Sequence, residues 1–291
     1  MIVIDFSGIA VANIFVQHSH DELGEDMLRH MVLNSICMYN KKFSKDYGHI
    51  FIACDCGSWR KDVFKFYKAN RKIGREASTI DWDEVFGWLD KIKQELVDFS
   101  PYTVLTVQNA EADDIIAQLC HRTQEFGQCE DVMIVSSDKD FKQLQRYSNV
   151  QQFSNLLKKF MKEPNPYHYL FEHICKGDAS DGVPNIFSPD DILVTEGKRQ
   201  TPVSTKKIES YWEAGCAGKK VPWAKEEHER NFQRNRRLID LTCIPKEVRD
   251  RIDTEIDAQD KRSRPIDQNN FLNYLIKNRC TQLIERLPEF F

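Results

Sequence analysis

Short runs of apolar, mostly β-branched residues alternate with longer segments of helical spacing through the first half of this chain. The runs cover residues 2–4, 50–54, 102–107 and 132–135, and the helical stretches cover about 26–45, 80–99 and 111–126. Parallel strands need crossover segments of this length, and strands covered on both faces read as continuous apolar runs. The pattern therefore predicts an α/β fold with a central, mostly parallel sheet flanked by helices.

The character of the sequence changes near residue 165. Asn165 and Pro166 are residue types that begin a helix, and Gly177 is the type that ends one. Beyond this helix we expect few strands and several helices, with a region rich in lysine and arginine from 198 to 237. We predict a first domain over 1–163 and a smaller, mainly helical domain over 164–291.

Acidic residues follow several of the apolar runs closely, as at Asp5, Asp55 and Asp138. The carboxyl ends of parallel strands meet at one edge of a sheet, so these carboxylates should gather there. Other acidic residues form short clusters: Glu111, Asp113, Asp114, Asp140, Asp178 and Asp181. Each alone is best explained as a turn or helix-cap residue, but carboxylates brought together repel one another unless a cation joins them. A ligand set made of oxygens predicts Mg²⁺ or Mn²⁺.

Composition and motifs exclude several classes of protein. The chain is 41% hydrophobic with a net charge of −4, and no apolar run approaches the roughly 20 residues that span a bilayer. The start lacks the features of a signal peptide, so we expect a cytoplasmic protein. The nine cysteines show no CxxC pairs and are interpreted as reduced thiols. Calcium-loop, P-loop, GxSxG and HExxH patterns are absent from the sequence.

A basic segment interrupts this acidic chain between residues 58 and 75. Its cationic residues outnumber its one acid, Asp62, and are Arg60, Lys61, Lys65, Lys68, Arg71, Lys72 and Arg75. Such a segregation of charge is compatible with a nucleic-acid partner. The alternative is a solvated basic helix with no ligand.

Five motifs, in this order, resemble those of the 5′ nuclease (flap endonuclease) family, whose fold is PIN-like. They are residues 4–5, the strand that ends at Asp55, residues 111–114, residues 136–141 and residues 177–184. The resemblance covers most of the first 185 residues. The likeness is narrowed to the bacteriophage members, which act as ribonuclease H, by Ser35 and by residues 59–60, 67–71 and 196–202. For a phage-encoded member the expected location is the host cytoplasm.

The resemblance implies a structure-specific, metal-dependent 5′ to 3′ exonuclease and flap endonuclease. Such an enzyme acts on RNA–DNA and DNA–DNA duplexes and removes RNA primers in lagging-strand replication. It implies two Mg²⁺ ions, for which Mn²⁺ substitutes. The first ion position corresponds to Asp55, Glu111, Asp113 and Asp138 with Asp5 close by, and the second to Asp140, Asp178 and Asp181 with Asp114 as an outer carboxylate.

The resemblance also assigns nucleic-acid contacts. Residues of about 58–80 correspond to a helical arch, in which Lys68 and Arg71 share one helix face, Lys68 draws the scissile phosphate inward, and Tyr67 stacks on a terminal base. The second domain is expected to bind duplex through Lys198, Arg199, Lys206 and Lys207. This chain departs from many relatives because residues 185–195 contain no glycine, which puts a glycine-rich helix-hairpin-helix in doubt.

Alternatives remain open at this point. A non-catalytic DNA junction-binding protein of the same fold would not need the acidic set, and a small RNA-cleaving toxin would lack the second domain. The expected partners are forked, flapped or nicked DNA and RNA–DNA hybrid, and the expected state is a monomer without membrane contact. A single-stranded DNA-binding protein and a sliding clamp are candidate partners. Phe290 and Phe291 either dock such a clamp or complete the protein's own core with Leu283, Ile284 and Leu287.

Overall fold

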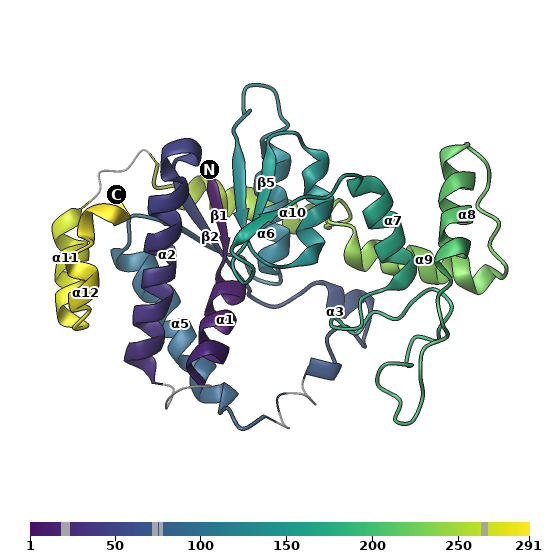
Figure 1. Ribbon diagram of the computed structural model, residues 1–291, viewed down its shortest axis with the longest axis horizontal. Helices are drawn as coiled ribbons and strands as arrows, with labels where there is room; N and C mark the ends of the chain where they lie inside the picture. The colour runs from purple at the N-terminus through teal and green to yellow at the C-terminus, as the bar shows by residue number, and fades with distance from the viewer. Residues whose placement is uncertain (19–23, 72–74, 76–77, 263–266) are drawn as a thin grey trace. The chain divides into compact units, whose positions relative to one another are not determined.

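The computed structural model describes residues 1–18, 24–71, 75, 78–262 and 267–291 (Figure 1). It divides into two compact units. Unit 1 contains Met1–Gly57, Asp81–Lys162 and Lys246–Phe291, and unit 2 contains Ser58–Ile80 and Glu163–Pro245. One of these divisions falls beside the predicted boundary at residue 163. The units differ from the predicted domains of 1–163 and 164–291 in two segments, because Ser58–Ile80 belongs to unit 2 and Lys246–Phe291 belongs to unit 1.

Unit 1 is built on a six-stranded sheet with the strand order β3-β2-β1-β4-β5-β6. The strands are β1 (Ile2–Asp5), β2 (Ile50–Cys54), β3 (Thr103–Thr106), β4 (Val132–Val135), β5 (Val150–Ser154) and β6 (Lys159–Met161). Adjacent strands from β3 to β5 pair in parallel, and β6 is antiparallel to β5. This confirms the predicted fold class, although β5 and β6 were not predicted.

Helices cover both faces of this sheet. The order of the strands places α1 (Phe6–His18), α2 (Glu25–Tyr47) and α5 (Trp82–Phe99) on one face, since right-handed crossovers from β1 to β2 to β3 move in one direction. The return from β3 to β4 places α6 (Ala112–Arg122) on the other face, where α10 (Lys246–Gln259) packs against it (Figure 1). The remaining elements of unit 1 are η1 (Lys139–Arg146), α11 (Gln268–Lys277), α12 (Thr281–Ile284) and η2 (Leu287–Phe290).

The end of the chain forms part of the core of unit 1. The Phe290 ring is fully buried and lies 4.9 Å from the Phe271 ring, measured between centroids. The Tyr102 hydroxyl donates to the Phe290 carbonyl oxygen at 3.1 Å, and the Asn40 amide donates to the Glu289 carbonyl oxygen at 2.9 Å. The core alternative is therefore confirmed. The clamp alternative for Phe290 is wrong, because a buried ring cannot enter the pocket of another protein.

Unit 2 is mainly helical, with α3 (Arg60–Val63), α7 (Pro166–Lys176), α8 (Thr205–Cys216) and α9 (Glu226–Ile239). Asn165 caps α7 by accepting from the His168 amide, and Gly177 ends it with a φ of 69°, as predicted. One apolar cluster joins residues of the 58–80 segment to α7 and α9: Phe64, Tyr67, Ile174, Val183, Leu238 and Ile239. A second contains Cys175, Ile186, Ile208 and Tyr211.

The segment predicted as a helical arch has little regular helix in its described part. Helix α3 ends at Val63, and Lys68 lies in a turn with a φ of 56°. A positive φ of this kind does not occur within a helix. The prediction that Lys68 and Arg71 share one face of a helix is therefore wrong. Another predicted contact of this segment, Lys72, lies outside the described residues.

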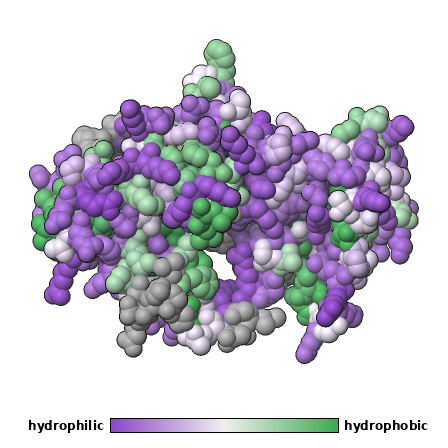
Figure 2. Space-filling view, in the orientation of Figure 1, coloured by the Kyte–Doolittle hydropathy of each residue, from purple (hydrophilic) through white to green (hydrophobic). Residues whose placement is uncertain are grey.

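Hydrophilic side chains cover most of the molecular face shown in Figure 2, and hydrophobic side chains gather in smaller patches. Within the described residues, no helix has both the length and the apolar character needed to cross a membrane.

Candidate metal centre

Three predicted carboxylates meet at the carboxyl edge of the sheet. Asp5 is the last residue of β1, Asp55 follows β2 directly, and Asp138 comes shortly after β4. Strand β1 lies between β2 and β4 and is parallel to both, so the three side chains reach the same edge. Burial raises the pKa of the Asp5 carboxyl to about 6, and the negative charges of Asp55 and Asp138 add to this shift. Such mutual repulsion among oxygen ligands is the situation that a divalent cation relieves.

Asp5 is held by a residue in the first turn of α1 and by the residue that follows β4. Its Oδ1 accepts from the Gly8 amide at 2.9 Å, and its Oδ2 accepts from the Ser136 hydroxyl at 3.0 Å. A Cβ atom at position 8 would lie 2.4 Å from the Asp5 Oδ2. Glycine at this position is therefore required for the observed placement of the carboxylate.

Asp55 connects the end of β2 to the starts of two helices. The Ser7 hydroxyl donates to its Oδ2 at 2.6 Å, and the Ala112 amide of α6 donates to its Oδ1 at 2.9 Å. The following residue, Cys56, pairs with Ala110 through an antiparallel bridge. These contacts fix the distance between Asp55 and the first turn of α6.

The first turn of α6 carries the next acidic cluster. Glu111 and Asp114 form a capping box, in which each side chain accepts from the backbone amide of the other. Both are buried, whereas Asp113 is half-buried on the same turn. Acidic side chains at the positive end of a helix stabilise the helix start. Asp114 thus has a structural role in closing the helix start, in addition to any role as an outer carboxylate.

The loop after β4 places Asp138 and Asp140. The Asp138 Oδ1 accepts from the Asp140 amide at 2.9 Å, and the Asp138 amide donates to the Ser136 hydroxyl at 3.1 Å. Gln152 of β5 is fully buried and donates to the carbonyl oxygens of Ser136 and Asp138 at 3.0 and 2.6 Å. Sequence reasoning missed Gln152 because a glutamine in an unpredicted strand carries no pattern that points to a site.

The predicted metal ligands of unit 2, Asp178 and Asp181, lie in the loop after α7. Asp178 is buried, and its Oδ1 accepts from the Ser180 hydroxyl and from the Ser180 amide at 2.9 Å. The His173 Nε2 lies 3.3 Å from the Asp178 Oδ2. Gly182 has a φ of 72°, and a Cβ there would lie 2.6 Å from the Phe66 carbonyl oxygen, so this loop packs closely against the 58–80 segment.

Asp181 is surrounded by residues that were predicted to contact nucleic acid. The Tyr67 hydroxyl donates to its Oδ2 at 2.9 Å, Arg71 pairs with its Oδ1 at 2.5 Å, and the Lys68 Nζ lies 3.5 Å from Oδ2. The Lys68 amide also donates to the Asp181 carbonyl oxygen at 2.7 Å. The structure therefore brings one predicted metal ligand together with the predicted arch residues.

Two of the predicted nucleic-acid contacts are wrong. Tyr67 is 5% exposed within an apolar cluster, so its ring is not available to stack on a base. Arg60 is 2% exposed, and its Nε donates to the Leu238 carbonyl oxygen at 2.8 Å. Its guanidinium group therefore binds within unit 2 and does not face a nucleic acid. Lys61 and Arg75 are exposed, as the prediction requires.

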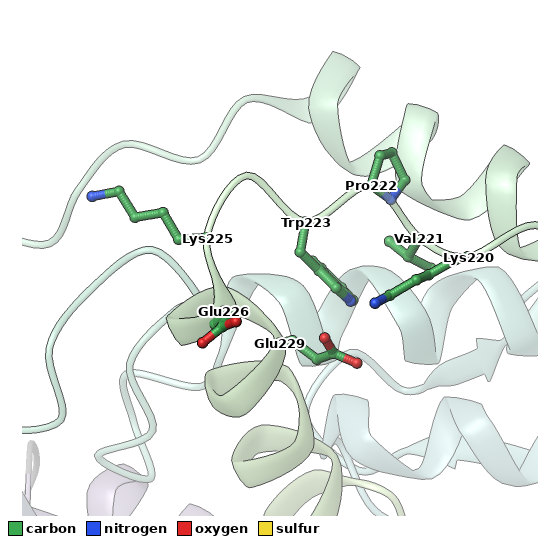
Figure 3. Close-up of a pocket in the computed structure, with 7 residues that line it drawn as sticks. All are labelled: Lys220, Val221, Pro222, Trp223, Lys225, Glu226 and Glu229. Carbon is green, nitrogen blue, oxygen red and sulfur yellow. The ribbon is translucent and has the colours of Figure 1, made fainter.

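The basic residues of the second half of unit 2 differ in accessibility. Lys198, Arg199 and Lys206 are exposed, whereas Lys207 is half-buried with its Nζ 4.8 Å from the centroid of the Phe187 ring. A shallow pocket beside α9 contains no predicted site residue (Figure 3). Its walls carry both signs of charge and consist of Lys220, Val221, Pro222, Trp223, Lys225, Glu226 and Glu229.

Comparisons with known proteins cover the whole chain. A family model described as the 5′-3′ exonuclease, N-terminal resolvase-like domain matches residues 2–171, and one described as T4 RNase H, C terminal matches residues 168–290. Ribonuclease H of Enterobacteria phage T4 is 32% identical over 298 residues, which cover 99% of this chain and 95% of that protein. A 5′-3′ exonuclease of Buchnera aphidicola subsp. Schizaphis graminum is 29% identical over 136 residues, 44% of each protein.

Two solved structures of similar fold are proteins of bacteriophage T5. The D15 protein co-crystallised with metal ions has a TM-score of 0.62 at 16% identity and covers 88% of this chain and 98% of its own. The D15 flap endonuclease in a pseudo-enzyme-product complex with DNA and metal ions has a TM-score of 0.63 at 15% identity, with coverage of 88% and 97%. At these identities the likeness concerns the fold.

Proposed function

Because the chain belongs to the 5′-3′ exonuclease family, we propose that it is a structure-specific nuclease that cuts RNA–DNA and DNA–DNA duplexes at 5′ ends and flaps. The family membership confirms the predicted class, a metal-dependent nuclease that acts in the 5′ to 3′ direction. The alternative function, a non-catalytic DNA junction-binding protein, is therefore rejected. The choice of substrate, the identity of the ions and the role of each residue are proposals.

The observation that carries the proposal is the meeting of Asp5, Asp55 and Asp138 at one edge of the sheet. Their oxygen-only chemistry and mutual repulsion fit Mg²⁺, with Mn²⁺ as a substitute. We propose that Glu111 and Asp113 complete the ligands of a first ion. A second ion is assigned to Asp140, Asp178 and Asp181 on the strength of their sequence motifs alone.

Divalent cations at such a centre supply an activated water and neutralise charge on the phosphate and the leaving oxygen. The residues of the chain hold the ligands in place for this chemistry. Gly8 and Ser136 orient Asp5, and Ser7 with the Ala112 amide orients Asp55. Because these carboxylates are fixed before substrate arrives, little reorganisation accompanies the reaction.

The proposed substrates come from the relatives. One relative is named for ribonuclease H activity, and a T5 flap endonuclease was solved with DNA, so flapped DNA and RNA–DNA hybrid are proposed here. Removal of RNA primers and cooperation with a single-stranded DNA-binding protein follow as proposals. We propose that Lys68 draws the scissile phosphate inward and that Arg71 also contacts phosphate. Lys198, Arg199 and Lys206 are proposed to contact duplex phosphates.

Replacement of the edge carboxylates tests this function. Asp138→Asn and Asp55→Asn should each abolish Mg²⁺- or Mn²⁺-dependent cleavage of a labelled 5′-flap duplex while binding of the duplex is kept. Asp46→Asn is a matched control, since Asp46 is an exposed acid near the end of α2. Substantial turnover by either edge variant at saturating metal would contradict the assignment of the centre.

A further inference from the structure

Aromatic rings fill the space between α2 and the β5–β6 hairpin of unit 1. Tyr39 and Phe43 come from α2, and Phe153 and Phe160 come from the hairpin. The Phe43 and Phe153 centroids lie 5.2 Å apart, and those of Phe153 and Phe160 lie 5.5 Å apart. Phe153 is buried, but Phe160 is 47% exposed. The cluster therefore has one side that faces solvent.

Two lysines lie against this cluster. The Lys42 Nζ is 3.7 Å from the centroid of the Phe153 ring. The Lys158 Nζ donates to the Tyr39 hydroxyl at 3.2 Å and lies 5.6 Å from the centroid of that ring. Lys42 and Tyr39 are three positions apart on α2 and so share a face of the helix. The faces of the rings attract the ammonium groups and hold them in place.

The positive charges of this surface are not balanced by acidic partners. Burial lowers the pKa of the Lys158 ammonium, and the charge of Lys42 lowers it further. Within the described ranges, neither lysine forms an ion pair with a carboxylate, and the same holds for the exposed Lys159. Like charges held together in this way are stabilised when an anion lies between them.

The lysine-bearing hairpin is connected to the carboxylate edge. Asn155, which lies in the turn of this hairpin, donates to the Gly8 carbonyl oxygen at 3.0 Å. The Gly8 amide in turn donates to the Asp5 carboxylate. The hydroxyls of Ser137 and Ser154 are 2.8 Å apart, and the Lys158 amide donates to the Ser154 carbonyl oxygen at 2.9 Å. The basic surface thus begins beside the residues that hold the carboxylates.

We propose that Lys42, Lys158 and Lys159 form a phosphate-binding surface for nucleic acid that continues beyond the cleavage site. This inference rests on the proposed nuclease function, since a strand cut at the carboxylate edge must continue across a neighbouring surface. Lysines on flexible stems contact phosphates without reading sequence. The exposed Phe160 ring offers an apolar contact to a sugar or base beside those phosphates. An acidic peptide could meet the same charges, but it has no reason to lie next to the carboxylates.

The double variant Lys42→Gln/Lys158→Gln tests the surface, with Lys159→Gln as a second variant that disturbs no ring contact. Binding of 5′-flap duplexes of two unrelated sequences is measured by fluorescence anisotropy across a series of KCl concentrations without divalent metal. The slope of log K against log salt should shrink by about 2 for the double variant and by about 1 for Lys159→Gln, equally for both sequences. The control Arg249→Gln/Lys277→Gln removes two exposed charges from α10 and α11 and should keep the wild-type slope.

Several results would overturn the inference. One is a wild-type slope in both variants. Another is a loss of affinity for only one of the two DNA sequences. A third is a loss of affinity for an acidic peptide or inorganic phosphate but not for DNA. Failure of the wild-type protein to bind or cleave the flap duplex would instead contradict the proposed function. Melting temperatures of all variants show whether the fold is retained.

Discussion

Truncation of the Phe290 side chain should destabilise the nuclease unit strongly. This ring is fully buried and contacts Phe271, and the carbonyl oxygen of the same residue accepts a hydrogen bond from the Tyr102 hydroxyl. Replacement of a buried phenylalanine by alanine costs about 3–5 kcal/mol in the free energy of unfolding. For a chain of this length a loss of 1 kcal/mol lowers the melting temperature by about 2 °C, so Phe290→Ala should lower it by roughly 6–10 °C.

Differential scanning calorimetry and near-ultraviolet circular dichroism measure this change. Ile276→Ala is the matched control, because Ile276 lies on α11 of the same unit and is 55% exposed. The control should melt close to the wild-type temperature. If Phe290→Ala melted like the wild type and instead lost stimulation by a replication clamp, the ring would be a docking residue and the packing argument would be refuted.

Three further predictions concern the sheet edge and the opposite end of the strands. Gly8→Ala should raise helix stability slightly but reduce turnover about 100-fold, because the new Cβ would displace the Asp5 carboxylate by about 1 Å. Single-turnover cleavage measures this loss. The control is Gly87→Ala, since a Cβ at position 87 meets open space. Gln152→Leu should lower the free energy of unfolding by roughly 2 kcal/mol and should lower turnover, since two carbonyl oxygens of the Asp138 loop lose their hydrogen-bond donor. Urea unfolding and cleavage assays measure the two effects, and an unchanged value of either would contradict this role of Gln152. Burial lowers the pKa of His49 to about 4 from 6.5, so the unfolded chain takes up a proton first as pH falls. Stability should drop by roughly 2–3 kcal/mol between about pH 6.5 and pH 4. Comparison of urea midpoints with those of His49→Gln, which should lose this part of the pH dependence, provides the check.

The strands that carry the acidic edge could be predicted because their burial on both faces demands continuous apolar residues. Strand β5 could not, since the sequence Val150–Ser154 includes two glutamines, one of which is buried only because it binds the carbonyl oxygens of the Asp138 loop. A polar residue that satisfies a loop through tertiary contacts leaves no periodic signal.

The basic segment shows a second limit of sequence reasoning. Its charges indicated a nucleic-acid contact, but charge pattern does not say which cations reach solvent. Arg60 is buried because a backbone carbonyl of Leu238, far away in the sequence, accepts its hydrogen bond. In the same way, several helices were expected after residue 164, but the sequence did not indicate that one of them, α10, packs in the core of unit 1.

The order in which the chain is made has a consequence for when the nuclease unit can fold. Residues 246–291 supply α10, α11 and the Phe290 ring to a core whose first strand is β1. The ribosome releases these residues after all of the strands and the whole of unit 2 have emerged. Unit 1 must therefore wait, with exposed apolar strands, until its last helices arrive, and contacts of such long sequence separation form slowly. The acidic edge can reach its final geometry only after that late closure, which delays nuclease activity until residues 246–291 have been synthesised.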